Sequence, residues 1–385
     1  MIKQFENRDY QVAFSHFGKI GPKKLKRLES FFPNLATAFT ASLLNLEKAG
    51  LEPLLAQKFS YWRQAFDLEA ALKELANEKI NFITWRENNY PDLLKELPDP
   101  PPILYYRGDW EAAIKPKQRR LAIVGSRQPS AYATKIIKEL MPTLSAAGIV
   151  IVSGLALGVD ALAHQATLDN QGKTLAVLGS GLSTVNIYPR ANRLLAESII
   201  KAGGLLISEF PPNIPPLKQN FPQRNRIIAG LCQATLVIEA KGKSGALITA
   251  NHCLEQNREV LAAPGNIFSA LSTGPNNLIK MGAKPILNAF DILEVFKLEP
   301  IIDLDQLRQR KNKKTRLAPI FKPENEAEEV VYNIIKESND QGEKITTDEI
   351  IKLSKLDTAT INSTLSILEI RGTVVSSLLG YEINC

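Results

Sequence analysis

The chain has 385 residues, of which 44% are hydrophobic, so we expect two or three domains with well-filled cores. The formal net charge of +7 permits nucleic acid or another anionic partner and identifies neither. The three cysteines are scattered and form no CxxC pair, which argues against a disulfide framework or a zinc site. No apolar run reaches the roughly 18 residues of a membrane span. We therefore expect a cytoplasmic protein with no membrane partner and no bound metal.

Residues 1–80 are expected to form a small helical domain, because apolar residues recur there at helical spacing. The stretch HFGKIGPKKLKRLESFF is similar to a helix-hairpin-helix, in which the backbone N–H groups of a glycine turn contact DNA phosphate. Lys19 stands where the first glycine of that turn usually lies, while Gly21 is present. We weigh packing against the rest of the protein slightly above DNA contact for this segment.

Residues 81–300 alternate short apolar runs with helical stretches, which is the pattern of βαβ units around a parallel sheet. The runs are rich in Val, Ile and Leu without polar alternation, as is typical of strands covered on both faces. We predict an α/β fold with an extended Rossmann-like, doubly wound and mostly parallel sheet. The predicted strands are Leu121–Gly125, Ile149–Ser153, Thr174–Gly179, Leu205–Ser208, Ala234–Glu239 and Glu259–Ala262.

The loops that follow these strands are the candidate site, because ligands bind beyond the carboxyl ends of the strands in a doubly wound sheet. Small residues let the backbone approach an anion closely, and N–H groups at the next helix N-terminus donate to it. A tight turn explains any one such loop equally well, but four on one edge, two of them with a cation, favour phosphate binding. The candidate residues are Gly125, Ser126, Arg127, Ser153, Gly154, Lys243, Ser244 and Gly245.

A further cluster lies near the start of a predicted helix in the stretch FPQRNRIIAG, which holds Arg224, Asn225 and Arg226. Cations at a helix N-terminus oppose the helix dipole, so their placement there calls for an anionic partner. The alternative is an ion pair with Glu209 or Glu239. We weigh the two explanations equally for Arg224 and favour the ligand for Arg226.

These loops lack the fingerprints of the common nucleotide sites. GSRQPS does not have the GxGxxG spacing of a dinucleotide site, and KGKSG does not have the glycine spacing of a P-loop, which disfavours NTP hydrolysis. Asp160 and His164 are four residues apart on one helical face, and we favour a structural role for them over metal binding or general-base catalysis. We therefore expect no cofactor and no catalytic residue.

The C-terminal part of the chain differs from the rest in charge. Residues 301–325 include six Lys or Arg between Arg308 and Arg316 and are expected to be a solvated basic linker. From Lys322 onward, six Lys or Arg stand against twelve Asp or Glu, a net of −6, which leaves +13 for the preceding residues.

Residues 326–385 are expected to form a winged helix, with helices from Ala327, from Thr347 and from Thr358 to Ile370, followed by a hairpin. The third helix would enter the DNA groove, yet no Lys or Arg precedes Arg371 in it. This absence argues against strong duplex binding and favours a protein-interaction or regulatory role.

The central motifs, in sequence order, resemble those of the DNA-processing protein A family (DprA, also called Smf). The similar segments cover about residues 88–296 and are YPDLLKELPDPPPILYYRGD, LAIVGSR, SGLALGVDALAHQATL, GKTLAVLGSGLSTVNIYPRAN, LLISEFPP, FPQRNRIIAGL, SGALITANHCLEQNREVLAAPGN and GPNNLIKMGAKPI. The resemblance implies sequence-independent binding of single-stranded DNA without hydrolysis. It also implies loading of the RecA recombinase during natural transformation and recombination, and a homodimer.

The resemblance assigns phosphate binding to the loop residues named above and to Asn225 and Arg226, with Lys280 as a weaker candidate. It makes Leu278, Ile279 and Ile286 candidates for a dimer interface, for which an ordinary core role is at least as good an explanation. The sequence departs from the family at Leu157, where a basic residue is common. Phe221 and Phe268 are candidates for stacking on bases.

Two other functions are weighed against this one. Nucleotide phosphoribohydrolases share a related core but carry a PGGxGTxxE loop whose Glu acts in catalysis, and the corresponding stretch here, KSGALITA, has no carboxylate. The third hypothesis is an adaptor that acts mainly through the acidic C-terminal domain.

Overall fold

The computed structural model describes residues 5–298, 323–340, 344–377 and 380–383. The chain divides into two compact units, Met1–Pro300 and Ile301–Cys385. The boundary predicted near residue 80 lies inside the first unit, and residues 301–322 of the predicted linker lie outside the described residues. Among the described residues, no helix combines the length and the apolar character that crossing a membrane requires.

A nine-stranded sheet forms the centre of the first unit, and β2 alone runs against the other eight strands. Its strand order is β1-β2-β6-β5-β4-β3-β7-β8-β9. The chain leaves β3 for β4 on one side and later returns to β7 on the other, so the topological switch point lies between β3 and β7. The strands are β1 (Asn81–Thr84), β2 (Ile103–Gly108), β3 (Arg120–Val124), β4 (Val150–Ser153), β5 (Thr174–Val177), β6 (Leu205–Ser208), β7 (Ala234–Val237), β8 (Glu259–Ala262) and β9 (Lys284–Pro285).

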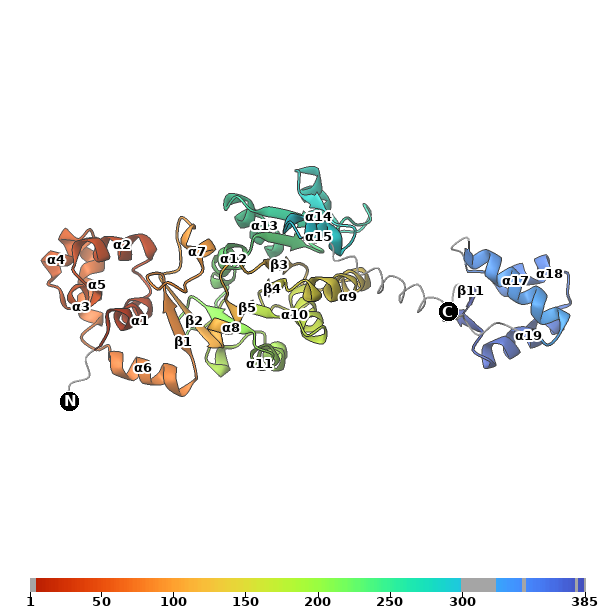
Figure 1. The fold of residues 1–385 in the computed structure, drawn as a ribbon, viewed down its shortest axis with the longest axis horizontal. Helices are drawn as coiled ribbons and strands as arrows, with labels where there is room; N and C mark the ends of the chain where they lie inside the picture. Colours follow the sequence, from red (N-terminus) through yellow and green to blue (C-terminus); the bar gives the residue numbers. More distant parts are fainter. Residues whose placement is uncertain (1–4, 299–322, 341–343, 378–379, 384–385) are drawn as a thin grey trace. The chain divides into compact units, whose positions relative to one another are not determined.

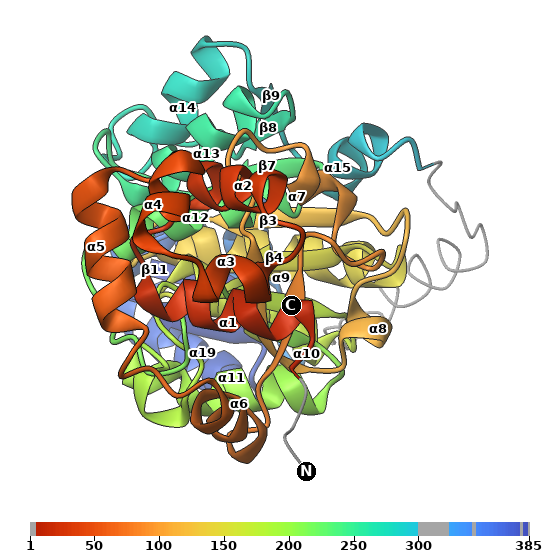
Figure 2. The same ribbon diagram turned by 90° about the vertical axis from the view of Figure 1, so that its left-hand side faces the viewer.

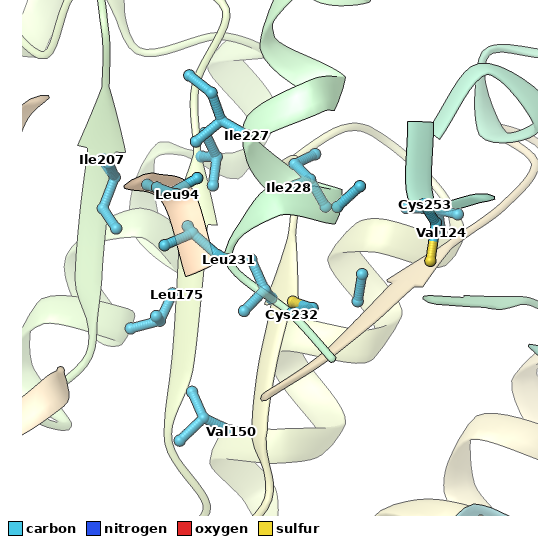
Figure 3. Packing of buried hydrophobic residues seen from close by; sticks show 14 of the residues in the cluster. Leu94, Val124, Val150, Leu175, Ile207, Ile227, Ile228, Leu231, Cys232 and Cys253 are labelled. Atoms are coloured by element: carbon cyan, nitrogen blue, oxygen red, sulfur yellow. The ribbon is translucent and has the colours of Figure 1, made fainter. Parts of the chain in front are cut away.

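Helices cover both faces of this sheet (Figure 1). They are α7 (Asp92–Lys95), α8 (Trp110–Ala113), α9 (Ala131–Ala146), α10 (Val159–Asp169), α11 (Arg193–Lys201), α12 (Asn220–Gly230), α13 (Gly245–Glu255), α14 (Thr273–Lys280) and α15 (Ala289–Val295), with short 3₁₀ turns at Thr184–Asn186 and Arg190–Asn192. On one face, α7, α8, α12, α13 and α14 share a core with alternate residues of the strands. Figure 3 shows part of this core, where Leu94, Ile227 and Leu231 pack together. The opposite face is covered by α9, α10, α11 and α15.

The N-terminal helices have a core of their own and also pack on the sheet. They are α1 (Asn7–Phe17), α2 (Pro22–Phe31), α3 (Leu35–Thr40), α4 (Leu43–Lys48), α5 (Pro53–Trp62) and α6 (Leu68–Asn77), and Figure 2 views the molecule from their side. Phe14 and Phe59 stack with ring centroids 5.1 Å apart inside their core. Val12 of α1 and Leu75 of α6 instead join a cluster with Tyr105 of β2, which fixes these helices to the sheet.

The second unit contains α17 (Glu326–Asp340), α18 (Thr347–Ser354) and α19 (Thr358–Ile370), followed by an antiparallel pair, β10 (Val374–Ser377) and β11 (Gly380–Ile383). The three helices lie at the positions that the sequence predicts. Val331, Ile350 and Leu365 belong to a separate small core. The assignment of this unit as a winged helix stays a prediction.

The α/β fold with a mostly parallel, doubly wound sheet is confirmed, and each predicted strand is present with at most two residues of difference at an end. The expected interface patch differs from the structure. Leu278 and Ile286 are only 6% and 4% exposed and belong to the two face cores, because α14 and the segment after β9 pack against the sheet. Ile279 is partly buried against the same core as Leu278.

Candidate functional site

A pocket of about 710 Å³ lies where the switch point predicts a ligand site. It is lined by the loops after β3 and β7, by the loop after β4, and by the first turns of α12 and α13. We call it the switch-point pocket. Seven of the predicted site residues line it: Gly125, Arg127, Arg224, Asn225, Lys243, Ser244 and Gly245.

The first wall of the pocket depends on glycines that let two loops touch. A Cβ atom on Gly125 would lie 2.7 Å from Cγ2 of Val159, so no side chain fits between β3 and α10. Gly158 has a φ of +81°, and a Cβ atom there would lie 2.3 Å from the Ser126 carbonyl oxygen. The Val159 N–H donates to the same carbonyl at 3.0 Å. This close packing holds the backbone of the first loop at the pocket edge while the Arg127 side chain remains exposed.

The second wall is the start of α13. Ser244 is the N-cap residue of this helix, and its hydroxyl accepts a hydrogen bond from the Ala246 N–H at 3.3 Å. The Asn225 side chain donates to the Gly245 carbonyl at 3.2 Å and so ties α12 to this turn. The positive dipole end of this 11-residue helix therefore lies at the pocket, an arrangement that favours an anion.

Arg224 lies buried beneath the pocket. Its guanidinium donates to the carbonyls of Gly154 and Val177, and a Cβ atom on Gly154 would lie 2.6 Å from its Nη2. Burial lowers the pKa of Arg224 to about 10, the Asp160 carboxylate opposes this shift, and the Arg127 cation adds to it. Arg224 therefore adds positive charge from below while its hydrogen bonds hold the strand ends together.

Three exposed cations line the pocket and have no carboxylate partner among the described residues. Arg127, Lys218 and Lys243 line it, and none of them has an ion pair within the part of the chain that the structure describes. The Arg127 guanidinium carbon lies 5.9 Å from the centre of the Phe221 ring. Tyr188 lies 5.9 Å from Phe221 between ring centres, so two aromatic rings adjoin these charges.

The other predicted site residues do not line the pocket. The Ser153 hydroxyl donates to the Ile123 carbonyl at 2.6 Å inside the sheet, and the Ser126 hydroxyl bonds within its own turn to Gln128. Lys280 is exposed on α14.

Arg226 turns away from the switch-point pocket. Its guanidinium pairs with Glu209 and lies 3.5 Å from Asp99. The structure therefore shows the ion-pair alternative for Arg226 and not the ligand contact that the sequence favoured for this residue. The sequence also offered an ion pair with Glu209 or Glu239 for Arg224. In the structure the charged partner of Arg224 is Asp160. Glu239 bonds neither arginine and accepts from the Ser130 N–H and hydroxyl at the start of α9.

Asp160 and His164 have separate partners. The Asp160 carboxylate accepts from the N–H groups of Gly154 at 3.0 Å and Ala156 at 3.4 Å, and burial raises its pKa. The His164 ring bonds the Thr174 hydroxyl at 2.6 Å, and burial lowers the pKa of this histidine to about 3. Among the described residues, no three His, Cys, Asp or Glu side chains gather in a way that could hold a metal ion.

The pocket lining includes three residues that the sequence analysis did not identify as site residues: Lys218, Tyr188 and Pro216. Tyr188 lies in the quoted motif NIYPRAN between the two 3₁₀ turns, and it is 47% exposed. Phe221, a stacking candidate, is in the pocket, whereas Phe268 is 90% exposed and outside it. Leu157, the departure from the family pattern, is 46% exposed and adjoins Ala156 of the lining.

The basic residues of α2 mostly serve the N-terminal helices. Lys24 pairs with Glu52 at 2.9 Å, Lys26 lies 5.3 Å from the centre of the Trp85 ring, and Arg27 donates to the Gly50 carbonyl at 3.4 Å. These contacts agree with a packing role for the segment and leave its DNA contact a prediction.

Comparison with known proteins agrees with this architecture. The family model described as DNA recombination-mediator protein A matches residues 81–297. Protein Smf of Synechocystis sp. is 40% identical over 299 residues, which cover 77% of this chain and 74% of that protein. DNA processing protein DprA of Bacillus subtilis is 42% identical over 227 residues, which cover 59% of this chain and 75% of that protein.

Two solved structures are similar as well. The X-ray structure of DNA processing protein A from Streptococcus pneumoniae has 34% identity and a TM-score of 0.64, and the match covers 76% of this chain and 98% of that one. A structure of DNA processing protein A from Helicobacter pylori, described for its single-stranded DNA binding mode, has 29% identity and a TM-score of 0.50. That match covers 57% of this chain and 95% of the other.

Proposed function

Because this chain belongs to the DNA recombination-mediator protein A family, we propose that it binds single-stranded DNA through the switch-point pocket, without sequence preference and without catalysis. The observation that carries the proposal is a group of three cations, Arg127, Lys218 and Lys243, that line the pocket with the N-terminus of α13 and have no ion pair among the described residues. An oxyanion placed there gains both the cations and the helix dipole. The Helicobacter pylori relative, described for its single-stranded DNA binding mode, supports DNA as the source of that oxyanion.

The pocket chemistry favours binding over the enzymatic alternative. Among the described residues that line the pocket, Asp160 is the sole carboxylate, and it is buried and bonded to two backbone N–H groups. A phosphoribohydrolase needs a reactive Glu in the loop after β7, where this chain has KSGALITA. The rings of Tyr188 and Phe221 beside the cations suit a strand whose bases stack while its phosphates are held.

We place this binding in DNA processing during natural transformation and recombination, with loading of the RecA recombinase as the step that follows capture of the strand. We also propose that the protein acts as a homodimer. Because Leu278 and Ile286 are buried, the interface would use their exposed neighbours Met281 and Leu287, which are 77% and 80% exposed. Sedimentation of the full chain and of the double variant Met281→Glu/Leu287→Glu tests this proposal. We expect the variant to sediment more slowly, and equal sedimentation coefficients for the two proteins would count against the interface.

Fluorescence anisotropy with labelled single-stranded and duplex oligonucleotides of one sequence tests the main proposal. We expect the full chain to bind the single strand more tightly, and Lys243→Ala to weaken that binding. Lys201→Ala removes the same charge from an exposed position on α11 and should leave the affinity unchanged. Equal binding by Lys243→Ala, Lys201→Ala and the unmodified chain would defeat the proposal.

A further inference from the structure

The loop between β8 and α14, residues 263–272, presents two large apolar side chains to solvent. Ile267 is 81% exposed and Phe268 is 90% exposed. Neither residue belongs to a hydrophobic cluster of the residues that the structure describes. Two neighbouring apolar side chains left in water gain free energy when a partner covers them. We call this segment the β8 loop.

Contacts within the β8 loop and with α14 brace its tip. Asn276 of α14 accepts from the Gly265 N–H at 3.1 Å and donates to the Gly265 carbonyl at 2.9 Å. A Cβ atom on Gly265 would lie 2.2 Å from Ser272 Oγ, so the two ends of the loop touch. The side-chain oxygen of Asn266 accepts from the Phe268 N–H at 2.9 Å. Because the backbone of the tip is already held, a partner that covers Phe268 orders little additional chain.

The β8 loop adjoins the cations of the switch-point pocket. The Ala240 N–H donates to the Leu271 carbonyl at 2.8 Å, and the Gly274 N–H donates to the Ala240 carbonyl at 2.8 Å. Ala240 directly precedes Lys241, and Lys243 lines the pocket. Both lysines are exposed and have no ion pair in the part of the chain that the structure describes. A strand whose phosphate is held at Lys243 therefore lies next to the β8 loop.

The charge of these two segments suits a polyanion. Residues 263–279 contain no charged residue, and residues 240–254 contain lysines but no Asp or Glu. Glu239, which precedes them, is 2% exposed and accepts from the Ser130 N–H. A phosphate backbone that follows the β7 and β8 loops therefore meets two lysines and no exposed carboxylate from either segment.

A second copy of the chain is the alternative partner for the tip of the β8 loop. The residues that we assign to the homodimer, Met281 and Leu287, flank β9, which lies on the far side of β8 from β7. The β8 loop instead bonds to Ala240 beside β7, whose following loop lines the switch-point pocket. An aromatic side chain next to cations is also the combination that single-strand binding surfaces use.

We propose that the β8 loop is a second stacking platform for the bound single strand, with Phe268 against one base and Ile267 beside it. This inference rests on the proposed function, in which Phe221 and Tyr188 stack bases inside the switch-point pocket. The strand would pass from those rings over the cations to Phe268. Stacking accepts every base because every base has a flat face, so the second platform adds affinity without sequence preference.

Anisotropy titrations of the full chain with labelled oligothymidylate test the inference. We expect Phe268→Ser to bind at least about fivefold more weakly than the unmodified chain, the loss typical of one stacked base. Phe268→Tyr keeps the ring and should keep the affinity. Phe290→Ser removes a ring that is 54% exposed on α15, outside the pocket, and should bind like the unmodified chain.

A strand of abasic positions separates stacking from a change in fold. Without bases there is nothing for Phe268 to stack on, so Phe268→Ser and the unmodified chain should bind the abasic strand equally. The salt dependence of oligothymidylate binding should also be the same for these two proteins, because the substitution removes no phosphate contact. A general loss of structure would instead weaken binding of both strands.

Equal binding of oligothymidylate by Phe268→Ser and Phe290→Ser overturns the inference and leaves the proposed function intact. If Phe268→Ser also sediments more slowly than the unmodified chain in that case, the tip is a contact between two copies of the chain. A loss of affinity that is the same for the abasic strand likewise overturns stacking. Failure of the unmodified chain to bind any strand overturns the proposed function and this inference together.

Discussion

Arg224 is a buried cation whose contacts serve the fold as well as the site. It is 4% exposed and compensates the buried Asp160 carboxylate. Replacing it with Ala leaves that carboxylate alone and removes the hydrogen bonds to Gly154 and Val177. We expect Arg224→Ala to lower the free energy of unfolding of the first unit by about 3–5 kcal/mol.

Urea denaturation checks this value, with Lys201→Ala as the control that should change stability by no more than about 0.5 kcal/mol. If Arg224→Ala kept full stability and lost only DNA affinity, Arg224 would be a direct DNA contact rather than a structural support.

We expect Glu209 to make the stability of the protein depend on pH. Burial raises the pKa of its carboxyl to about 7, while Arg226 opposes this shift and Asp99 adds to it. A carboxyl whose pKa is higher in the folded than in the unfolded chain contributes to the free energy of unfolding. The full contribution is present when the pH is below the pKa of the unfolded chain, about 4.3. That contribution is lost as the pH rises through about 7.

The variant Glu209→Gln does not titrate, so the stability difference between the unmodified chain and the variant should fall by roughly 3 kcal/mol from pH 4 to pH 8. Denaturation midpoints at intervals across this range measure it. If stability changed with pH in the same way for the two proteins, Glu209 would have the same pKa in the folded and the unfolded chain.

At the scale of elements, the strands were predictable because a continuous apolar run such as Leu205–Ser208 has one stable position, buried between two helical layers. The antiparallel β2 was harder to predict. Its run, ILYYRG, is buried in its first half and only partly buried in its second half. The direction of this strand follows from its pairing with β6. The glycine loops were recognisable because Gly125 and Gly158 permit contacts that no side chain allows.

The orientation of neighbouring side chains on α12 was not predictable. Arg224, Asn225 and Arg226 are consecutive, yet they turn toward Gly154, Gly245 and Glu209 respectively. Consecutive side chains on a helix point in directions that differ by about 100°, so a small rotation of α12 would change which cation faces the pocket. The sequence pattern alone does not reveal how a helix is rotated against its neighbours. The same limit applies to Leu278, whose burial depends on how α14 packs.

The helix α19 is expected to contribute little to duplex binding. Arg371, which follows its last residue, pairs with Glu324 and Glu328, and α19 itself has no Lys or Arg. The second unit has its own core, so residues 323–385 can be tested as a fragment. We expect no duplex binding below about 1 μM at physiological salt, where nonspecific affinities are typically 10⁻⁴–10⁻⁶ M. Sub-micromolar binding in an anisotropy titration would show that this unit reads DNA.

At the scale of the whole molecule, charge is divided along the chain. The residues before Lys322 carry a net +13 and those from Lys322 onward a net −6. The positive part contains the switch-point pocket and its exposed cations Arg127, Lys218 and Lys243, and we propose that DNA phosphate binds there. An overall charge of +7 hides this division.

The salt dependence of single-strand affinity tests the central claim most directly, because each lost phosphate contact lowers the slope of log K against log salt by about 0.7. We expect Arg127→Ala/Lys243→Ala to lower the magnitude of this slope by roughly 1.4 and to bind at least about tenfold more weakly at low salt. The control Lys58→Ala/Lys201→Ala removes two exposed charges outside the pocket and should retain the slope of the unmodified chain. Equal slopes for both double variants would contradict phosphate binding in the switch-point pocket.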